Sequence, residues 1–156
     1  MEMVAAVKMR RAQGAVLAAR PYAEKMAELL SNLAGMPQDD EQNALLQSRP
    51  IERVTLVHIT PDRGLCGALP GSLNRQAGSF ILEEQSGIPV KVVTVGRKGR
   101  DFMVRYERDV QAVFDGIGDR PALVDIAPMA RLIMDSFIAG ETDAVYISYG
   151  HFVNTV

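Results

Sequence analysis

The sequence predicts an α/β fold, in which a mostly parallel sheet flanked by helices is joined to a long N-terminal helix. The first 33 residues are rich in strong helix formers, and their apolar side chains recur at alternating steps of four and three. The rest of the chain alternates short β-branched runs with helical segments, which is the pattern of βαβ units. This second part is therefore expected to be Rossmann-like.

The N-terminal helix is predicted to be one half of a coiled coil. A narrow apolar seam of period 3.5, held here for about four heptads, is typical of coiled coils, whereas a helix lying on a globular domain has a broader face of period 3.6. Alanine is frequent in this seam, so a second helix could approach closely. Pro21 is expected to kink the helix, because it lacks a backbone donor. The seam consists of Ala5, Met9, Ala12, Val16, Ala19, Ala23, Met26, Leu30 and Leu33.

The sequence contains no second heptad segment to cover this seam. Either the chain dimerises or the partner helix lies beyond Val156, and we expect a chain truncated at both ends. Without a partner, the helix is expected to be partly disordered or to pair with a second copy of the chain. The predicted division is a coiled-coil helix over 1–34, a polar connection over 35–52 and an α/β domain over 53–156.

Within the α/β domain, strands and helices are predicted in strict alternation. The strands are the β-branched runs 53–60, 89–95, 110–114 and 144–149, of which 110–114 is expected at a sheet edge. The intervening helices are predicted over 72–85, 98–107 and 123–139.

Composition excludes several classes of protein. A net charge of −2 argues against a nucleic-acid binder, and the lack of an apolar run near 20 residues argues against membrane insertion. The single cysteine, Cys66, suits a reducing compartment and is interpreted as a small, buried or half-buried residue. His58 lies in an apolar strand and is interpreted as a satisfied core histidine, and His151 as a surface residue. No catalytic residue, metal site or cofactor is predicted.

The segment from Thr60 to Asn74 follows a buried strand and precedes a helix, where α/β proteins bind phosphates. It contains neither GxGxxG nor GxxxxGK[ST], so a tight structural turn is favoured. A nucleotide-binding enzyme remains one alternative. A coiled-coil dimerisation module with an attached α/β domain remains another.

The same segment resembles the T-[ST]-D-R-G-L-C-G signature of the gamma subunit of F-type ATP synthases, although Pro61 and Ala68 depart from the usual residues. The signature positions are Thr60, Asp62, Arg63, Gly64, Leu65, Cys66 and Gly67. Further stretches are similar to the family in the same order, namely Glu2–Gln13 with Ala19–Met26, Val95–Phe102, Gly116–Pro121 and Phe152–Val156. The resemblance covers essentially the whole chain.

The resemblance implies a non-catalytic central-stalk rotor that couples proton-driven rotation of the membrane c-ring to ATP synthesis or hydrolysis in a hexamer of alpha and beta subunits. The N-terminal helix would pair with a C-terminal helix in an antiparallel coiled coil inside that hexamer. The α/β domain would lie beside the epsilon subunit and the c-ring, on the cytoplasmic side of a bacterial plasma membrane. Contacts with acidic loops of the beta subunits are expected from Met1, Lys8, Arg10 and Arg11.

Overall fold

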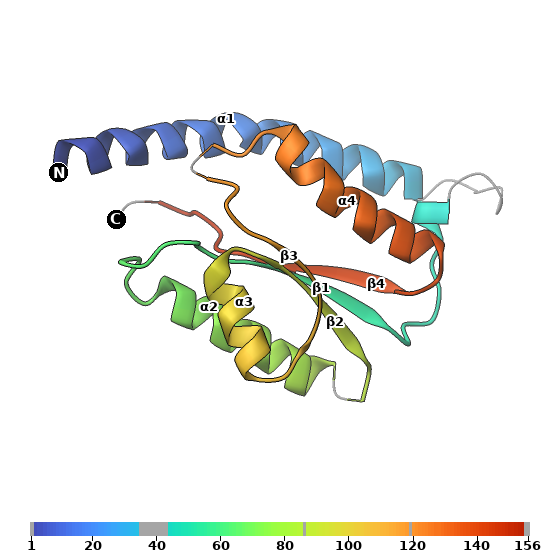
Figure 1. Ribbon diagram of the computed structural model, residues 1–156. Coiled ribbons are helices and arrows are strands. Elements are labelled where there is room, and N and C mark those ends of the chain that lie inside the picture. The colour runs from blue at the N-terminus through green and yellow to red at the C-terminus, as the bar shows by residue number, and fades with distance from the viewer. Residues whose placement is uncertain (1, 35–43, 86, 119, 155–156) are drawn as a thin grey trace. The chain divides into compact units, whose positions relative to one another are not determined.

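The computed structural model describes residues 2–34, 44–85, 87–118 and 120–154. They belong to two compact units, one formed by 1–47 with 152–156 and the other by 48–151. The first unit holds the long helix, and the second holds the sheet with its flanking helices (Figure 1).

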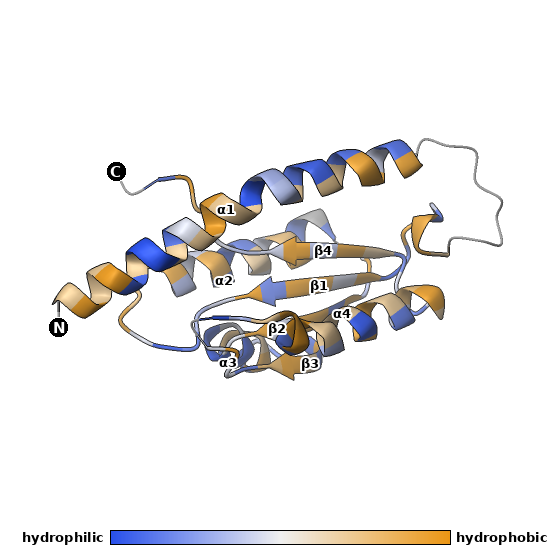
Figure 2. Cartoon of the chain, turned by 90° about the horizontal axis from the view of Figure 1, so that it is seen from above, coloured by the Kyte–Doolittle hydropathy of each residue, from blue (hydrophilic) through white to orange (hydrophobic). Residues whose placement is uncertain are grey.

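The first unit is built on α1 (Glu2–Ala34), whose 33 residues correspond to a rod of about 50 Å. The helix is continuous through Pro21, so the predicted partial disorder is wrong for this structure; runs of Ala, Leu, Met, Glu and Lys favour a helix without a partner. Every residue of the predicted seam is exposed. Apolar and charged residues alternate along the helix in Figure 2.

The second unit contains a sheet that confirms the predicted α/β class. In the described part of the chain it has four strands, β1 (Val54–Ile59), β2 (Val90–Val95), β3 (Asp109–Phe114) and β4 (Ala144–Ser148), in the order β3-β2-β1-β4. All neighbouring strands are parallel. β1 is central and almost wholly buried, whereas β3 lies at an edge, as the sequence predicts.

Helices cover both faces of the sheet (Figure 1). α2 (Leu69–Ser79), its π-helical continuation η2 (Phe80–Glu84) and α3 (Arg97–Arg105) lie on one face, and α4 (Leu123–Ile138) lies on the other. α2 begins three residues earlier than predicted, because Pro70 is compatible with a first helical turn. A core cluster joins the first face to the strands and consists of Leu56, Ala77, Ile81, Val92 and Met103. A short 3₁₀ turn, η1 (Ala44–Leu46), belongs to the first unit.

His58 is a satisfied core histidine, as predicted. Its imidazole is fully buried, with Nε2 2.9 Å from Oδ1 of Asn74 and Nδ1 3.3 Å from Oγ of Ser148. The Asn74 amide nitrogen donates to the carbonyl of Lys98 at 3.2 Å, so its Oδ1 accepts and His58 Nε2 carries the proton. The ring therefore connects β1 to α2 and β4, and through Asn74 to α3.

Burial lowers the pKa of His58 below 6.5, although the hydrogen bond to Asn74 acts in the opposite direction. Below about pH 6.5 the unfolded chain binds this proton more readily than the folded chain does. The free energy of unfolding is therefore expected to fall as the pH is lowered from about 8 to about 5.5, and urea denaturation at each pH measures it. The variant H58Q should show a flatter dependence in that window, whereas H151Q should follow the wild type, because His151 is exposed. Equal slopes for all three proteins would contradict this account.

Candidate functional site at the carboxyl edge of the sheet

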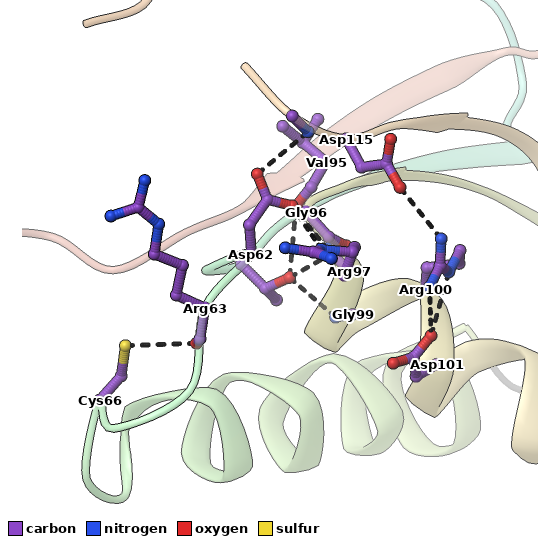
Figure 3. Close-up of polar contacts among 12 residues, drawn as sticks. Asp62, Arg63, Cys66, Val95, Gly96, Arg97, Gly99, Arg100, Asp101 and Asp115 are labelled. Atoms are coloured by element: carbon purple, nitrogen blue, oxygen red, sulfur yellow. Dashed lines mark hydrogen bonds and ion pairs between the residues drawn. The ribbon is translucent and has the colours of Figure 1, made fainter. Parts of the chain in front are cut away.

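The predicted signature loop lies at the carboxyl edge of the sheet. Because all four strands are parallel, the segments that follow β1, β2 and β3 meet at this edge. Open α/β sheets bind their ligands there, so the residues of this edge form the candidate site (Figure 3).

Thr60 connects the end of β1 to the start of α3. Its backbone N–H donates to the carbonyl of Val95 at 2.8 Å, and its hydroxyl oxygen accepts the N–H of Gly99 at 2.8 Å. The hydroxyl also lies 3.3 Å from the Val95 carbonyl, to which it can donate. Thr60 is therefore buried as a structural connector and leaves no hydroxyl free for a ligand.

Asp62 bridges two further segments of the edge. One carboxylate oxygen accepts the N–H of Arg97, the first residue of α3, at 3.0 Å, and the other accepts the N–H of Gly116, after β3, at 3.0 Å (Figure 3). The Arg97 Nε lies 4.0 Å from the first of these oxygens. The start of a helix is the preferred position for a phosphate, and here a side chain of the same protein occupies it.

Two glycines permit the close approach of these segments. Gly96 has a φ of +95°, and a Cβ atom there would lie 2.0 Å from the Thr60 carbonyl oxygen. A Cβ at Gly99 would lie 2.8 Å from the His58 ring. These glycines therefore serve contacts between chain segments, which is the structural role favoured for the glycines of this edge.

The tip of the signature loop points into solvent. Leu65 has a φ of +62° and a fully exposed side chain, and Gly67 has a φ of +58°. The Cys66 thiol is half-buried, as predicted, with Sγ 3.5 Å from the carbonyls of Arg63 and Gly64. The loop thus has a fixed base, at Thr60 and Asp62, and an exposed apolar tip.

A cavity of about 600 Å³ lies beside this base. Its wall is mainly apolar and includes Ile59, Ile117, Ile126 and Met129, with Asp62 and Arg97 among its charged residues. Among the described residues, no group of His, Cys, Asp or Glu side chains could hold a metal ion. The edge offers shape and apolar surface but no assembled set of acid, base and nucleophile.

The other predicted site residues lie on α1, in the first unit. Lys8, Arg10 and Arg11 have exposed side chains, and Met1 lies outside the described residues. Of the predicted site residues, Thr60 and Asp62 form hydrogen bonds with other segments of the chain. The seam residues and the basic residues lie on the surface of α1. Their roles as contact residues stay predictions.

Sequence reasoning missed the partners of Thr60 and Asp62. The backbone N–H groups of Arg97, Gly99 and Gly116 carry the site, and no side-chain pattern identifies a backbone donor. The only available signal was positional, because each of these residues follows a predicted strand of a parallel sheet and so had to lie at the same edge.

Comparison with known proteins identifies the family. A family model described as ATP synthase matches residues 1–156. The ATP synthase gamma chain of Dehalococcoides mccartyi is 49% identical over 156 residues, and that of Roseiflexus castenholzii is 44% identical over 158. This chain belongs to the ATP synthase gamma chain family. The resemblance of the signature loop is thereby confirmed, as is the assignment to the non-catalytic central-stalk subunit.

A solved structure shares the fold of this gamma chain. The match is to the central stalk and c-ring of the Tetrahymena thermophila mitochondrial ATP synthase, with a TM-score of 0.74 and 25% identity, covering 99% of this chain and 65% of that one. The chain spans about half the length of the curated gamma chains, 54% for both bacterial relatives named above. Within the described residues, no helix combines the length and apolar character that crossing a bilayer requires.

Proposed function

We propose that this gamma chain forms part of a rotor shaft that couples rotation of a membrane c-ring to conformational change in a catalytic hexamer of alpha and beta subunits. The observation that carries the proposal is the exposed heptad seam on a 33-residue helix, in a chain of the gamma family. Such a shaft biases catalytic subunits among states of different nucleotide affinity, because it contacts those states differently. No bond is made or broken on the shaft itself.

In this proposal, α1 is one strand of an antiparallel coiled coil. Every residue of its seam is exposed, and many of them are small, so a second helix can pack closely against it. The curated relatives are nearly twice as long as this chain, which gives room for that helix elsewhere in a full-length gamma chain. We keep the predicted division, in which 1–34 is the shaft helix, 35–52 the connection and 53–156 the α/β domain.

The proposed contacts with the hexamer are electrostatic. Lys8, Arg10 and Arg11 bring three positive charges, all exposed, to one end of α1, and Met1 precedes them. Long flexible cationic side chains suit a contact with acidic loops that must re-form as the shaft turns. The α/β domain would be the foot of the shaft, beside an epsilon subunit and the c-ring, on the cytoplasmic side of a bacterial plasma membrane.

Reconstitution tests this function. A full-length gamma chain that carries residues 1–156 of this sequence is expected to restore ATP hydrolysis to alpha and beta subunits that are poorly active alone. A complex that assembles with this gamma chain but shows no gain in hydrolysis, and no rotation of a bead attached to gamma, would refute the rotor proposal.

The basic residues provide a second test in the same complex. The double variant R10E/R11E is expected to lower ATP hydrolysis several-fold at low salt, and less at high salt, because salt screens exposed charges. The matched control is R75E/R131E, which reverses two exposed charges on α2 and α4 instead. Equal losses for the two variants would show that the charges at the start of α1 have no specific role.

The two alternative functions receive less support. The amide donors of a phosphate site at the start of α3 are taken by Thr60 and Asp62, which argues against a nucleotide-binding enzyme. Equilibrium dialysis with ATP or NAD tests that alternative, and stoichiometric binding would favour it. A dimerisation module predicts a tight dimer that persists in the full-length protein, and sedimentation equilibrium would detect it.

A further inference from the structure

We infer that Asp62 is an internal anion that fills the phosphate position at the carboxyl edge of this domain and latches the signature loop to the rest of the sheet. It is a positioning residue, because both carboxylate oxygens accept hydrogen bonds from the chain itself. The inference is independent of the rotor function, because it concerns only the second unit and its own contacts.

As a first support, the carboxylate of Asp62 joins two segments that are far apart in the sequence. The two oxygens of Asp62 accept hydrogen bonds from backbone N–H groups of different segments, Arg97 at the start of α3 and Gly116 after β3, each at 3.0 Å (Figure 3). Convergent N–H groups at a helix start are what α/β proteins use to hold a phosphate. Here the carboxylate of the chain provides the negative charge, and its side chain is only 22% exposed.

The second support is the way Thr60 completes the arrangement. The N–H of Gly99, in the first turn of α3, donates to the Thr60 hydroxyl at 2.8 Å, so this donor is also satisfied from within the loop. The Lys98 N–H donates to the Pro61 carbonyl at 3.3 Å. Residues 60–62 thus satisfy the N–H groups of residues 97, 98 and 99, and a phosphate would have to displace all three contacts.

The third support is the cavity of about 600 Å³ beside this carboxylate. Space for a ligand is present at the edge where α/β domains bind nucleotides, and Arg63 and Arg97 line it together with Asp62. The carboxylate of Asp62, however, already occupies the N–H groups that phosphate oxygens would need. Like charges at hydrogen-bond distance repel strongly when they are partly desolvated. A phosphate could therefore bind at this edge only by displacing the Asp62 carboxylate.

The latch also predicts the mobility of the loop, which the chain itself can report. Cys66 is the only cysteine of the sequence and lies four residues beyond Asp62, half-buried in the loop. Its rate of reaction with a thiol reagent such as DTNB therefore reports how far the loop shields the thiol. No labelling site needs to be introduced.

The experiment compares the rate of Cys66 modification in the wild type and in D62A, under native conditions. D62A is expected to react about tenfold faster or more. The reason is that the variant loses two charge-assisted hydrogen bonds that hold the loop against the sheet. D62N keeps the shape and one acceptor but loses the charge, so an intermediate rate is expected. The control is D101A, which removes an exposed partner of Arg100 on α3 and should leave the rate within about twofold of wild type.

Chemical rescue distinguishes an anion site from a merely structural side chain. Formate, which matches the carboxylate that D62A lacks, is expected to slow Cys66 modification in that variant, whereas chloride at equal ionic strength should not. Neither salt should affect the wild type. If D62A does not fold, the comparison of D62N with D101A carries the test.

Two results would overturn the inference. A Cys66 rate in D62A or D62N equal to that of the wild type would show that Asp62 does not hold the loop. A rate in folded D62A that responds equally to formate and chloride would show that the position does not select a carboxylate.

Discussion

The variant G96A is expected to lower the free energy of unfolding of the α/β domain by about 3 kcal/mol or more, a large fraction of the total stability of an ordinary domain. Gly96 has a φ of +95°, which a residue with a Cβ atom adopts only under strain. The added methyl group would also lie 2.0 Å from the Thr60 carbonyl oxygen, which is backbone and cannot rotate away. Relief would require β1 and β2 to separate at their ends, where the Thr60 N–H donates to the Val95 carbonyl.

The matched control is G78A. Gly78 lies inside α2, and a Cβ atom there would meet the Phe102 ring at 3.8 Å, an ordinary van der Waals contact. Alanine in a helix interior is more stable than glycine by about 0.5–1 kcal/mol, so G78A should be neutral or stabilising. Urea denaturation followed by circular dichroism measures both variants, and a G96A protein as stable as G78A would refute the proposed close packing.

The variant A19D, in a full-length gamma chain, is expected to abolish the activation of ATP hydrolysis in the reconstituted complex. Ala19 lies in the proposed seam, where a second helix would bury it. A carboxylate buried in that contact without a partner costs several kcal/mol, which is enough to prevent the two helices from pairing at this position. A loss of more than about tenfold in hydrolysis rate is therefore expected.

The neighbouring residue supplies the control. Ala18 precedes Ala19 on the same helix, about 100° away around its axis, and lies outside the seam. A18D carries the same charge and the same helix propensity, so hydrolysis should stay within about twofold of wild type. If A18D and A19D lower the rate equally, the seam at these positions is not an interface.

The sequence was sufficient to predict the fold because the pattern was unambiguous. Runs such as VTLVHI and VKVVTV could only be buried strands, and the helices between them required parallel neighbours. The edge position of β3 was also predicted, from the shortness of the run 110–114. Helix ends were less accurate, since α2 begins at Leu69 and continues as a π turn to Glu84, and no residue pattern marks that change.

The candidate site was only half predictable. Thr60 and Asp62 stood out as family residues, but their function as hydrogen-bond acceptors depends on N–H groups 35 to 54 residues away. Backbone donors have no residue type, so only the fold brings them to notice. The helix over 1–34 was predicted, but its order was not, because the exposed seam suggested dependence on a partner. The high helix propensity of its Ala, Leu, Met, Glu and Lys residues favours the helix even so.

The second unit begins with β1 and ends with β4, and these strands are hydrogen-bonded neighbours that run in the same direction. A pull on residue 48 and residue 151 in opposite directions therefore acts on opposite ends of the pair and slides one strand along the other. The hydrogen bonds between Val54–His58 and Ala144–Ser148 are then loaded in shear, so all of them carry the force together and do not break one after another. A domain entered and left in this way resists stretching far better than its thermodynamic stability alone would suggest.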